Sequence, residues 1–473
     1  MKLRLGYHPV SSWQVSVPAG KSQSHRALIM AALADGTSTL ERLPDNDDVN
    51  ATRKCLEQLG AVFETTEDHM TVHGIGGHLP EGELRLDCGA SGSTLRFMIA
   101  LAGLRHGKTI FTGTDRLLAR PLDEYRELFT GQSLVFDHNG TRRIVAGGLH
   151  GSLFSVSGER SSQFVSGLLM ALPLMKEDTA LQVSGPLQSA SYVDLTEQYL
   201  SLAGIRYQRQ DHCWQIPGNQ TYQPLHAVIG PDVSSAAPFA VLAAMTKSEV
   251  LISGLKAETK HPDMRVFDIL QDMGAEVSFV PAGCLVRGSE LKGSTVDLGN
   301  CPDLGPVLIV LAGAAAGATR FIHAGRLRYK ESDRLAVMAE ELAKCGMAMT
   351  VLDDEVMIEG QTPQQPETEL DCHRDHRIAM ALSLMTARLQ EPVVLAGTEC
   401  IAKSYPDYFA VLENSGRGVR EGTCPQAGIP HAKLAGTEST DAGLGRDPET
   451  VRRGKREMMV PKWIRLLRKG RMS

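Results

Sequence analysis

A charged stretch in the last third of the chain, residues 328–334, contains the residue types that acid and base catalysis requires. It reads Arg-Tyr-Lys-Glu-Ser-Asp-Arg, and the apolar spacing after it predicts a helix with Ser332 or Asp333 as its N-cap. Lys330 and Arg334 would then share one helix face, with Glu331 beside them. Two cations next to one carboxylate suit a small anionic substrate and a group that transfers a proton. A solvated surface cluster of ion pairs has the same composition, so the interpretation depends on the rest of the chain.

The composition excludes several classes of protein. The chain has 473 residues, 42% of them hydrophobic, which is enough for two cores, and it contains neither a signal peptide nor an apolar run long enough to cross a membrane. Nine scattered cysteines without a Cys-x-x-Cys pair indicate neither a disulfide framework nor a zinc site. The net charge of −6 argues against a general nucleic-acid binder. We therefore expect a cytoplasmic, monomeric protein that binds no membrane and no nucleic acid.

The elements that must position the charged residues follow a repeat. Helical apolar runs end at a glycine and are followed by two short strand-like runs around a polar turn. These glycines recur every 70 to 73 residues and define six copies: Gly60, Gly131, Gly204, Gly274, Gly346 and Gly416. A unit of this kind cannot bury its apolar surface alone, so neighbouring copies must share a core.

A second series has the same period. Each copy contains a Gly-, Ser- or Asp-rich segment followed by a nearly all-apolar helix, and these segments begin at Gly20, Ser91, Ser161, Asp232, Asp303 and Asp375. Helices that are apolar on all sides are buried. If several of their positive N-terminal ends converge, they form an anion site. Eight cations would reinforce it and imply a substrate with two phosphates or a phosphate and a carboxylate: Lys21, Arg26, Arg96, Arg120, Lys330, Arg334, Arg377 and Lys403.

Three copies per domain predict an α/β (α+β) fold with two similar domains of three helix/strand units each. The sixth copy lacks a hairpin after Gly416, and an N-terminal hairpin of residues 2–5 and 14–17 is expected to fill the vacancy. One domain would then comprise residues 1–19 plus 229–416, and the other residues 20–228. Residues 417–473 are Gly- and Pro-rich and then basic, and we expect them to form a disordered tail. The ligand would bind in the cleft between the two domains.

Seven separated motifs resemble those of the 5-enolpyruvylshikimate-3-phosphate synthase family, the 3-phosphoshikimate 1-carboxyvinyltransferases. They are GKSQSHR at 20–26, GASGSTLR at 89–96, ARP at 119–121, SSQF at 161–164, KESDR at 330–334, DHR at 375–377 and AKSYPDYF at 402–409. The resemblance implies the inside-out α/β barrel of the enolpyruvyl transferases. It also implies transfer of the enolpyruvyl group of phosphoenolpyruvate to the 5-hydroxyl of shikimate-3-phosphate, with release of phosphate. This reaction belongs to the shikimate pathway to chorismate and aromatic amino acids and calls for no metal and no organic cofactor.

The resemblance also assigns roles to residues. It implies that shikimate-3-phosphate is held by Lys21, Ser22, Arg26, Ser161, Ser162, Gln163, Ser189, Tyr192, Asp303 and Lys330. It implies that phosphoenolpyruvate is held by Lys21, Gly92, Arg120, Gln163, Arg334, Arg377 and Lys403. Asp303 would accept the hydroxyl proton, and Glu331 would give and later remove the methyl proton, with Lys21 and His376 as assistants. Three residues depart from the commonest family pattern. His25 and Ala90 stand where asparagine is frequent, and Arg326 stands at the place of an asparagine that contacts the substrate in the family.

Two other functions stay open at this point. UDP-N-acetylglucosamine enolpyruvyl transferase shares the fold and the donor, but its usual loop cysteine has no counterpart between Asp115 and Ala119. The basic end of the chain suggests a non-catalytic anion- or RNA-binding protein instead. A P-loop is not supported, since Val15 stands where it needs a glycine, and His373 and His376 lack a third metal ligand.

Overall fold

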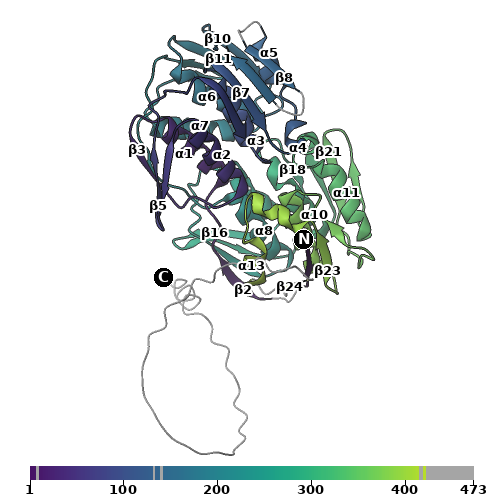
Figure 1. Ribbon diagram of the computed structural model, residues 1–473. Coiled ribbons are helices and arrows are strands. Elements are labelled where there is room, and N and C mark those ends of the chain that lie inside the picture. The colour runs from purple at the N-terminus through teal and green to yellow at the C-terminus, as the bar shows by residue number, and fades with distance from the viewer. Residues whose placement is uncertain (7–9, 131–133, 139–141, 147, 415–418, 422–473) are drawn as a thin grey trace, which may run out of the picture. The chain divides into compact units, whose positions relative to one another are not determined.

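The computed structural model describes residues 1–473 except 7–9, 131–133, 139–141, 147, 415–418 and 422–473. Within this part of the chain, six buried helices form the interior (Figure 1): α1 (Lys21–Leu33), α3 (Gly92–Ala102), α6 (Ser162–Ala171), α8 (Val233–Met245), α10 (Gly305–Ala314) and α12 (His376–Met385). All residues of α8 from Val233 to Ala244 are buried, as expected for helices that are apolar on every side. The predicted series of helix starts is confirmed.

A second helix accompanies each buried one and exposes one face. These helices are α2 (Asp47–Gln58), α5 (Asp123–Phe129), α7 (Ala190–Leu202), α9 (Arg265–Asp272), α11 (Arg334–Lys344) and α13 (Tyr408–Asn414). Shorter helical segments connect the units: α4 (Asp115–Leu118), η1 (Leu172–Leu174), η2 (Pro262–Met264), η3 (Pro302–Leu304), η4 (Gly325–Tyr329), η5 (Thr386–Arg388) and η6 (Thr398–Lys403).

Four of the repeat glycines end their helices in the same way. Gly60, Gly204, Gly274 and Gly346 all have positive φ, from 68° to 112°. After α2, the Gly60 N–H donates to Glu57 O at 3.0 Å and the Ala61 N–H to Leu56 O at 3.1 Å, which is the Schellman pattern. The other three make the equivalent pair of hydrogen bonds. The structural reason for the glycine period is therefore a left-handed residue after the helix in each of these four units, while Gly131 and Gly416 lie outside the described residues.

The strands form four-stranded sheets of one repeated design. In each sheet the first two strands are parallel and the remaining neighbours are antiparallel. The first sheet has the order β14 (His226–Val228), β3 (Thr37–Glu41), β5 (His69–His73), β4 (Val62–Thr65). The second has the order β6 (Gly82–Asp87), β7 (Gly107–Thr112), β9 (Arg142–Ala146), β8 (Leu134–His138). The third has the order β10 (Leu153–Ser157), β11 (Thr179–Ser184), β13 (Cys213–Ile216), β12 (Gln208–Gln210).

The other three sheets have the same order. The fourth sheet contains β2 (Ser12–Val15), β15 (Glu249–Ser253), β17 (Gly283–Arg287) and β16 (Glu276–Val280). The fifth contains β18 (Thr295–Asp297), β19 (Ala318–Ile322), β21 (Glu355–Glu359) and β20 (Met349–Val351). The sixth contains β22 (Leu370–Asp371), β23 (Val393–Ala396), β1 (Lys2–Leu5) and β24 (Val419–Glu421). Alternating buried and exposed residues, as in β10, show that one face of a sheet covers the helices and the other meets solvent. The predicted α/β fold with helices inside and strands outside is confirmed.

The predicted N-terminal hairpin is wrong. β1 does fill the sixth sheet, where it pairs with β23, but β2 belongs to the fourth sheet and runs parallel to β15. A pattern of two short strands around a turn cannot distinguish a hairpin from two strands that separate, because the partners lie far away in the sequence. β24 adds a further strand beside β1, so the expected disordered tail is also wrong for residues 419–421. The remainder of that tail lies outside the described residues.

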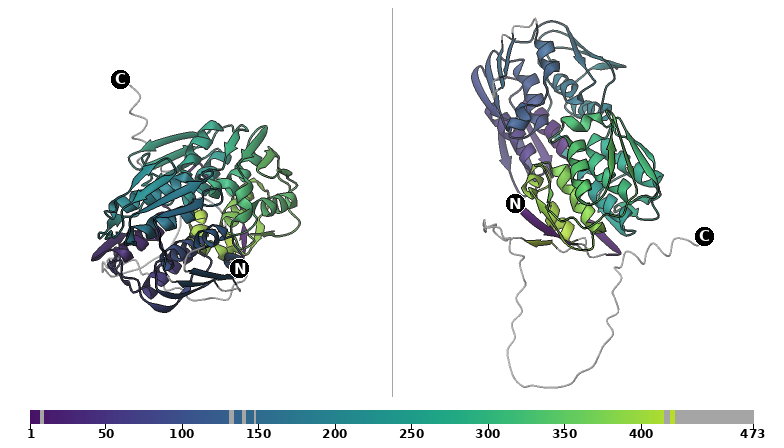
Figure 2. Two further views of the ribbon diagram at one scale, coloured as in Figure 1. Left: turned by 90° about the horizontal axis from the view of Figure 1, so that it is seen from above. Right: turned by 90° about the vertical axis from the view of Figure 1, so that its right-hand side faces the viewer.

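The apolar core consists of two clusters. One runs from Ala19 to Ile229, and the other joins residues 3–17 to residues 233–412. Figure 2 shows the corresponding purple-to-teal and green-to-yellow halves as two neighbouring groups of elements. The chain passes between the clusters at two adjacent segments, where the Gly20 N–H donates to Gly230 O and the Asp232 N–H to Pro18 O, both at 2.8 Å. The predicted domain boundaries themselves stay a prediction.

We predict that Gly60→Ala lowers the free energy of unfolding by about 1–3 kcal/mol, because an L-residue at φ 106° is strained. Crowding does not contribute, since the nearest atom to the added Cβ, Ile75 Cγ2, lies at 3.6 Å. Gly230→Ala is the matched control, because the φ of Gly230 is not positive and an added Cβ would lie 3.8 Å from Gln23 Oε1. The free energy of unfolding of this variant should stay within about 0.5 kcal/mol of the parent value. Urea unfolding measures the free energy of unfolding of both variants. Equal decreases in the two variants would contradict the prediction.

Candidate active site

The buried helices direct several of their N-termini into one cavity. Residues at the starts of α1, α3 and α6, and in η3 just before α10, line a space of about 1020 Å³ that is partly open to solvent. Seven cations and three carboxylates line it: Lys21, Arg26, Arg96, Arg120, Arg160, Arg326 and Lys330, with Asp48, Asp303 and Glu331. The predicted convergence of helix starts therefore holds for four of the six, and the cavity is strongly cationic.

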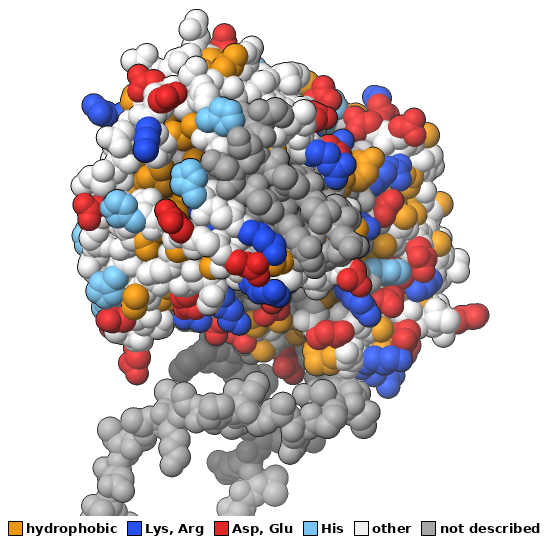
Figure 3. Space-filling model, turned by 45° about the horizontal axis from the view of Figure 1, so that its top comes forward, with side chains coloured by type: hydrophobic (Ala, Val, Ile, Leu, Met, Phe, Trp, Pro, Cys, Tyr) orange, Lys and Arg blue, Asp and Glu red, His pale blue; other side chains and the backbone are white. Residues whose placement is uncertain are grey.

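One face of the outer surface does not share this excess of positive charge. On the face shown in Figure 3, basic and acidic side chains are interspersed. The chain as a whole carries a net charge of −6. This face therefore lacks the concentration of cations found in the cavity, where the opposite charge of a ligand would balance it.

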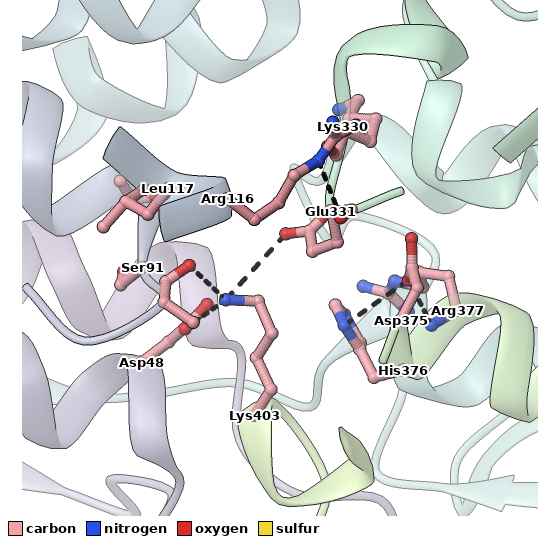
Figure 4. Close-up of polar contacts among 12 residues, drawn as sticks. Asp48, Ser91, Arg116, Leu117, Lys330, Glu331, Asp375, His376, Arg377 and Lys403 are labelled. Carbon is pink, nitrogen blue, oxygen red and sulfur yellow. Dashed lines mark hydrogen bonds and ion pairs between the residues drawn. The ribbon is translucent and has the colours of Figure 1, made fainter. Parts of the chain in front are cut away.

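The structure places the predicted site residues in two groups. All ten residues expected to hold the acceptor line the cavity, as do Gly92, Arg120 and Glu331. Four others are buried and do not line it: Arg334, Arg377, Lys403 and His376. Figure 4 shows His376 and Lys403 near Glu331, on the side away from α4. These residues therefore form a layer directly behind the cavity wall.

Arg334 connects the carboxylates of the site. Its side chain is only 1% exposed, and it makes ion pairs to Asp303 Oδ1 (2.9 Å), Glu331 Oε2 (2.9 Å) and Asp375 Oδ2 (2.8 Å). Asp333, not Ser332, caps α11, which begins only at Arg334. The expectation that Lys330 and Arg334 share a helix face is therefore wrong. Lys330 precedes the helix, and its Nζ lies 3.1 Å from Asp303 Oδ1.

Glu331 is surrounded by cations. Arg120 Nη2 lies 3.2 Å and Lys403 Nζ 3.9 Å from Glu331 Oε1, in addition to the Arg334 contact. Burial favours the neutral acid, but Arg120, Arg334 and Lys403 outweigh it and hold the pKa of Glu331 well below its ordinary value. In the same way, burial opposes ionisation of Asp303, while Lys330, Arg334 and Arg377 hold its pKa well below the ordinary value. Both carboxyl groups are ionised at neutral pH.

Asp48 is a member of the site that sequence reasoning missed. Its carboxylate accepts from Lys21 Nζ at 2.8 Å and from Lys403 Nζ at 2.6 Å, and Lys403 also donates to Ala90 O at 2.7 Å (Figure 4). Burial raises its pKa, but Lys21 and Lys403 lower it more, so the pKa of Asp48 is depressed. In the sequence Asp48 looks like any acidic residue in the first turn of a helix, as does its exposed neighbour Asp47. Only the approach of Lys403 distinguishes the two.

Arg116 was also missed. From α4 its guanidinium donates to Glu331 O (3.1 Å) and Lys330 O (3.3 Å), so it holds the backbone of the charged stretch 328–334 (Figure 4). Its signal in the sequence, one arginine in a short polar loop, was no stronger than that of any surface arginine.

His376 is buried and neutral. Neither ring nitrogen makes a hydrogen bond with the described residues, although Asp375 Oδ1 lies 3.8 Å from Nδ1. Burial, Lys21 and Arg377 lower its pKa well below 6.5. Asp375 itself caps α12, where its carboxylate accepts from the Arg377 N–H at 2.9 Å. Arg377 Nη1 in turn donates to Ser234 O at 2.8 Å, so the starts of α8 and α12 are linked.

The start of α6 supplies hydroxyl and amide groups. Ser161 caps the helix, and Gln163 bonds to Arg96 Nη1 at 2.7 Å and to Ser93 Oγ at 2.9 Å. Arg26 donates to Thr196 Oγ1 at 2.7 Å and to Tyr192 O at 2.9 Å. These groups are neutral acceptors, so the charges of Arg26 and Arg96 stay available to an anion.

One cluster of metal-ligand type occurs among the described residues, formed by Glu340, Glu341 and His373. The Glu341 carboxylate is fully buried and already accepts from Lys344 Nζ at 2.8 Å, His373 Nε2 at 2.7 Å and the Asp371 N–H at 3.0 Å. His376 lies elsewhere, in the layer behind the cavity, so the two histidines do not combine. In the same described part, no helix is long and apolar enough to span a membrane.

Comparison with known proteins gives one consistent result. Residues 9–412 match the family model for EPSP synthase (3-phosphoshikimate 1-carboxyvinyltransferase). The 3-phosphoshikimate 1-carboxyvinyltransferase of Clostridium botulinum (strain Alaska E43 / Type E3) is 35% identical over 404 residues, which is 84% of this chain and 93% of that protein. The enzyme of the same name from Clostridioides difficile (strain 630) is 35% identical over 424 residues, 87% of this chain and 96% of that protein.

Solved structures agree. EPSP synthase from Acinetobacter baumannii superimposes with a TM-score of 0.71 and 25% identity over 89% of this chain and 99% of that one. The enolpyruvyl transferase NikO from Streptomyces tendae has a TM-score of 0.71 at 18% identity over 90% of this chain and 99% of that one, which shows the shared fold. With its repeats, its cationic cavity and these matches, the chain belongs to the EPSP synthase family and is a 3-phosphoshikimate 1-carboxyvinyltransferase of the shikimate pathway.

Proposed function

We propose the following assignment of residues to the transfer of the enolpyruvyl group from phosphoenolpyruvate to the 5-hydroxyl of shikimate-3-phosphate. The acceptor lies along the starts of α1 and α6 and contacts Ser189, Tyr192, Asp303 and Lys330. The observation that carries this assignment is that all ten predicted acceptor residues, from separate segments of the chain, line the same cation-rich cavity. An anion with a phosphate and a carboxylate supplies the negative charge that this cavity lacks.

Phosphoenolpyruvate is assigned to the neighbouring cations Lys21, Arg120, Arg334, Arg377 and Lys403, together with Gly92 and Gln163. Gly92 suits this place, because a Cβ there would lie 2.6 Å from Arg120 Nη1. In the described structure Arg120, Arg334 and Lys403 are engaged by carboxylates. A bound donor would compete for them with its own phosphate and carboxylate.

This competition has a consequence for Glu331. Its low pKa depends on Arg120, Arg334 and Lys403. When the anionic donor draws on these cations, the carboxyl group is less stabilised as an anion, and its pKa rises. Glu331 can then give a proton to C3 of phosphoenolpyruvate and remove one again when phosphate leaves C2.

Asp303 is assigned as the group that accepts the proton of the 5-hydroxyl as its oxygen attacks C2. Its Oδ1 binds Lys330 and Arg334, whereas Oδ2 makes no hydrogen bond or ion pair with any residue in the described ranges. Oδ2 is therefore available to the hydroxyl. The arginines and lysines around it stabilise the charge that develops on phosphate and carboxylate, and Lys21 and neutral His376 assist.

We also propose that the enzyme acts as a monomer and works in the cytoplasm.

The acceptor assignment predicts that phosphate is released from phosphoenolpyruvate when shikimate-3-phosphate is present. Release should be absent with UDP-N-acetylglucosamine and without an acceptor, because the serines and cations of the cavity match a small phosphorylated acid. A coupled phosphate assay with the full chain measures all three. Release only with the nucleotide sugar would overturn the acceptor assignment while leaving the donor site intact.

Glu331→Gln should lower kcat by a factor of about 10²–10⁴, the usual range for the loss of a general acid or base. Gln keeps the size of the side chain but cannot transfer the proton, so the dissociation constant of shikimate-3-phosphate should change only a few-fold. Glu340→Gln, an exposed position on α11, serves as the matched control and should leave kcat unchanged. Steady-state kinetics and calorimetric binding distinguish the cases; unchanged turnover in Glu331→Gln would refute the assignment.

Asp48→Asn should destabilise the protein at pH 7 by about 3–5 kcal/mol, because it leaves the buried Lys403 and the partly buried Lys21 without the carboxylate that they share. The pKa of Asp48 is depressed in the folded state, so its stabilisation is complete above the ordinary value of 3.8 and is lost as the pH falls toward the folded value. The difference from the parent should thus be constant from pH 7 to 5 and shrink below about pH 4.

Urea unfolding across this pH range, with Asp47→Asn as control, provides the test. Asp47→Asn should lower the free energy of unfolding by less than about 1 kcal/mol, because Asp47 is exposed and only its interaction with the start of α2 is lost. If the difference in free energy of unfolding between Asp48→Asn and the parent does not shrink in acid, the charge of Asp48 is not what stabilises the fold.

A further inference from the structure

A strained turn, residues 372–375, leads into α12. His373 and Arg374 at its centre have φ values of 49° and 56°, in the left-handed region that residues other than glycine rarely adopt. The Asp375 N–H donates to Cys372 O at 2.9 Å and closes a β-turn around them. Two positive φ values at the centre of a β-turn favour glycine, asparagine and aspartate, and none of these stands here. Strain of this kind persists only where surrounding contacts hold it.

Glu341 on α11 holds the centre of this turn. Its carboxylate is fully buried and accepts from His373 Nε2 at 2.7 Å and from the Asp371 N–H at 3.0 Å. Lys344 Nζ lies 2.8 Å from Oε1 and 2.9 Å from Oε2 of Glu341 and supplies the opposite charge. The His373 N–H donates to Asp371 Oδ1 at 2.6 Å. Both the backbone and the side chain of His373 are therefore held.

The same helix holds the turn at a second place. Arg334 lies seven residues before Glu341, on the same face of α11. Its Nε donates to Asp375 Oδ2 at 2.8 Å, and its Nη2 donates to Asp375 Oδ1 at 3.2 Å. Arg334 thus fixes the end of the turn, and Glu341 fixes its strained centre.

The residues that follow the turn belong to the assigned donor site. Arg377 and His376 lie in the first turn of α12, next to Asp375 (Figure 4). The Arg377 N–H donates to Asp375 Oδ1 at 2.9 Å, so the place of this arginine depends on where the turn delivers Asp375. If His373 relaxed to negative φ, α12 would start in another direction and the Arg377 guanidinium would move with it.

We propose that Glu341 is a positioning residue for the donor site: by holding His373 in its left-handed conformation, it sets the start of α12 and thereby the place of Arg377. The proposal rests on the assignment of Arg377 to phosphoenolpyruvate made above. Glu341 does not line the described cavity, so it acts through the turn and not by contact with a substrate. None of the ten residues assigned to shikimate-3-phosphate lies on α12, so the effect of Glu341 is confined to the donor.

The test compares two replacements of His373 in the full chain that both remove the imidazole and its bond to Glu341. Alanine keeps the strain at φ 49°, whereas glycine adopts a positive φ freely. His373→Ala should raise the KM for phosphoenolpyruvate about 10-fold, because a displaced binding group loses its alignment with the substrate. His373→Gly should stay within about 3-fold of the parent KM, because its turn is not strained. In both variants kcat and the dissociation constant of shikimate-3-phosphate should change less than about 3-fold.

Glu341→Gln tests the other side of the same contact. It keeps the size of the side chain but removes its charge, and it should raise the KM for phosphoenolpyruvate about 3- to 10-fold. Because both residues act through one contact, the same change should raise the KM by less than about 2-fold in the His373→Gly background. Glu340→Gln, at the exposed neighbouring position, is the matched control and should keep the parent KM.

Circular dichroism checks that each variant is folded. Equal increases of the KM in His373→Ala and His373→Gly would overturn the proposal, because the strain of the turn would then be irrelevant. An unchanged KM in His373→Ala would overturn it as well, and so would an equal loss of shikimate-3-phosphate binding. Arg377→Lys separates these outcomes from a failure of the assignment beneath them. An unchanged KM for phosphoenolpyruvate in that variant would refute the donor assignment and the proposal with it, and a parent enzyme that releases no phosphate would refute the proposed function itself.

Discussion

The architecture of the site depends on one buried guanidinium, that of Arg334. A fully desolvated charge is tolerated only when partners compensate it, and removing a partner from such a group is strongly destabilising. Arg334 obtains three carboxylates from three different segments: Asp303 before α10, Glu331 in the preceding loop and Asp375 at the start of α12. Its burial therefore requires that these segments meet at one point. The two carboxylates assigned to catalysis are held in place by the same cation.

The buried helices provide the second constraint. Because they are apolar on every side, they must be covered by neighbouring units. The starts of four of them reach the same cavity. Polar groups at these ends need partners, and the caps Ser91, Ser161, Asp232 and Asp375 supply some of them. What the protein leaves unsatisfied around the cavity is mainly positive charge. The site is thus prepared for anions before a substrate arrives, with little reorganisation needed.

The balance between carboxylates and cations also explains how the same groups can bind and react. In the described structure the carboxylates of Asp48, Asp303 and Glu331 form ion pairs with lysines and arginines of the site. The substrates must therefore compete with these carboxylates for the same cations. These ion pairs reduce the energetic cost of holding the cations in the site when no substrate is bound. It also couples the protonation of Glu331 to occupation of the donor site, because the cations that depress its pKa are those assigned to phosphoenolpyruvate.

The sequence by itself determined the repeat, the helix starts and the family. These features are local: a glycine with positive φ after Leu59 or a capping serine at 161 acts through bonds to residues three to five positions away, so a pattern in one dimension records it. The ten acceptor residues were named from the resemblance to the family, and seven of them lie within its motifs: Lys21, Ser22, Arg26, Ser161, Ser162, Gln163 and Lys330. Their type and order were sufficient, without knowledge of distances.

Only the tertiary structure decided which segments pair across long separations. The N-terminal strands β1 and β2 joined different sheets, although they read as a hairpin, because their partners β23 and β15 lie hundreds of residues away. Asp48 became part of the site through Lys403, and Lys330 met Arg334 at Asp303 and not along a helix. Whether a charged side chain is balanced by a partner depends on contacts of this kind. For this reason the contacts of Asp48 could not be predicted from the sequence.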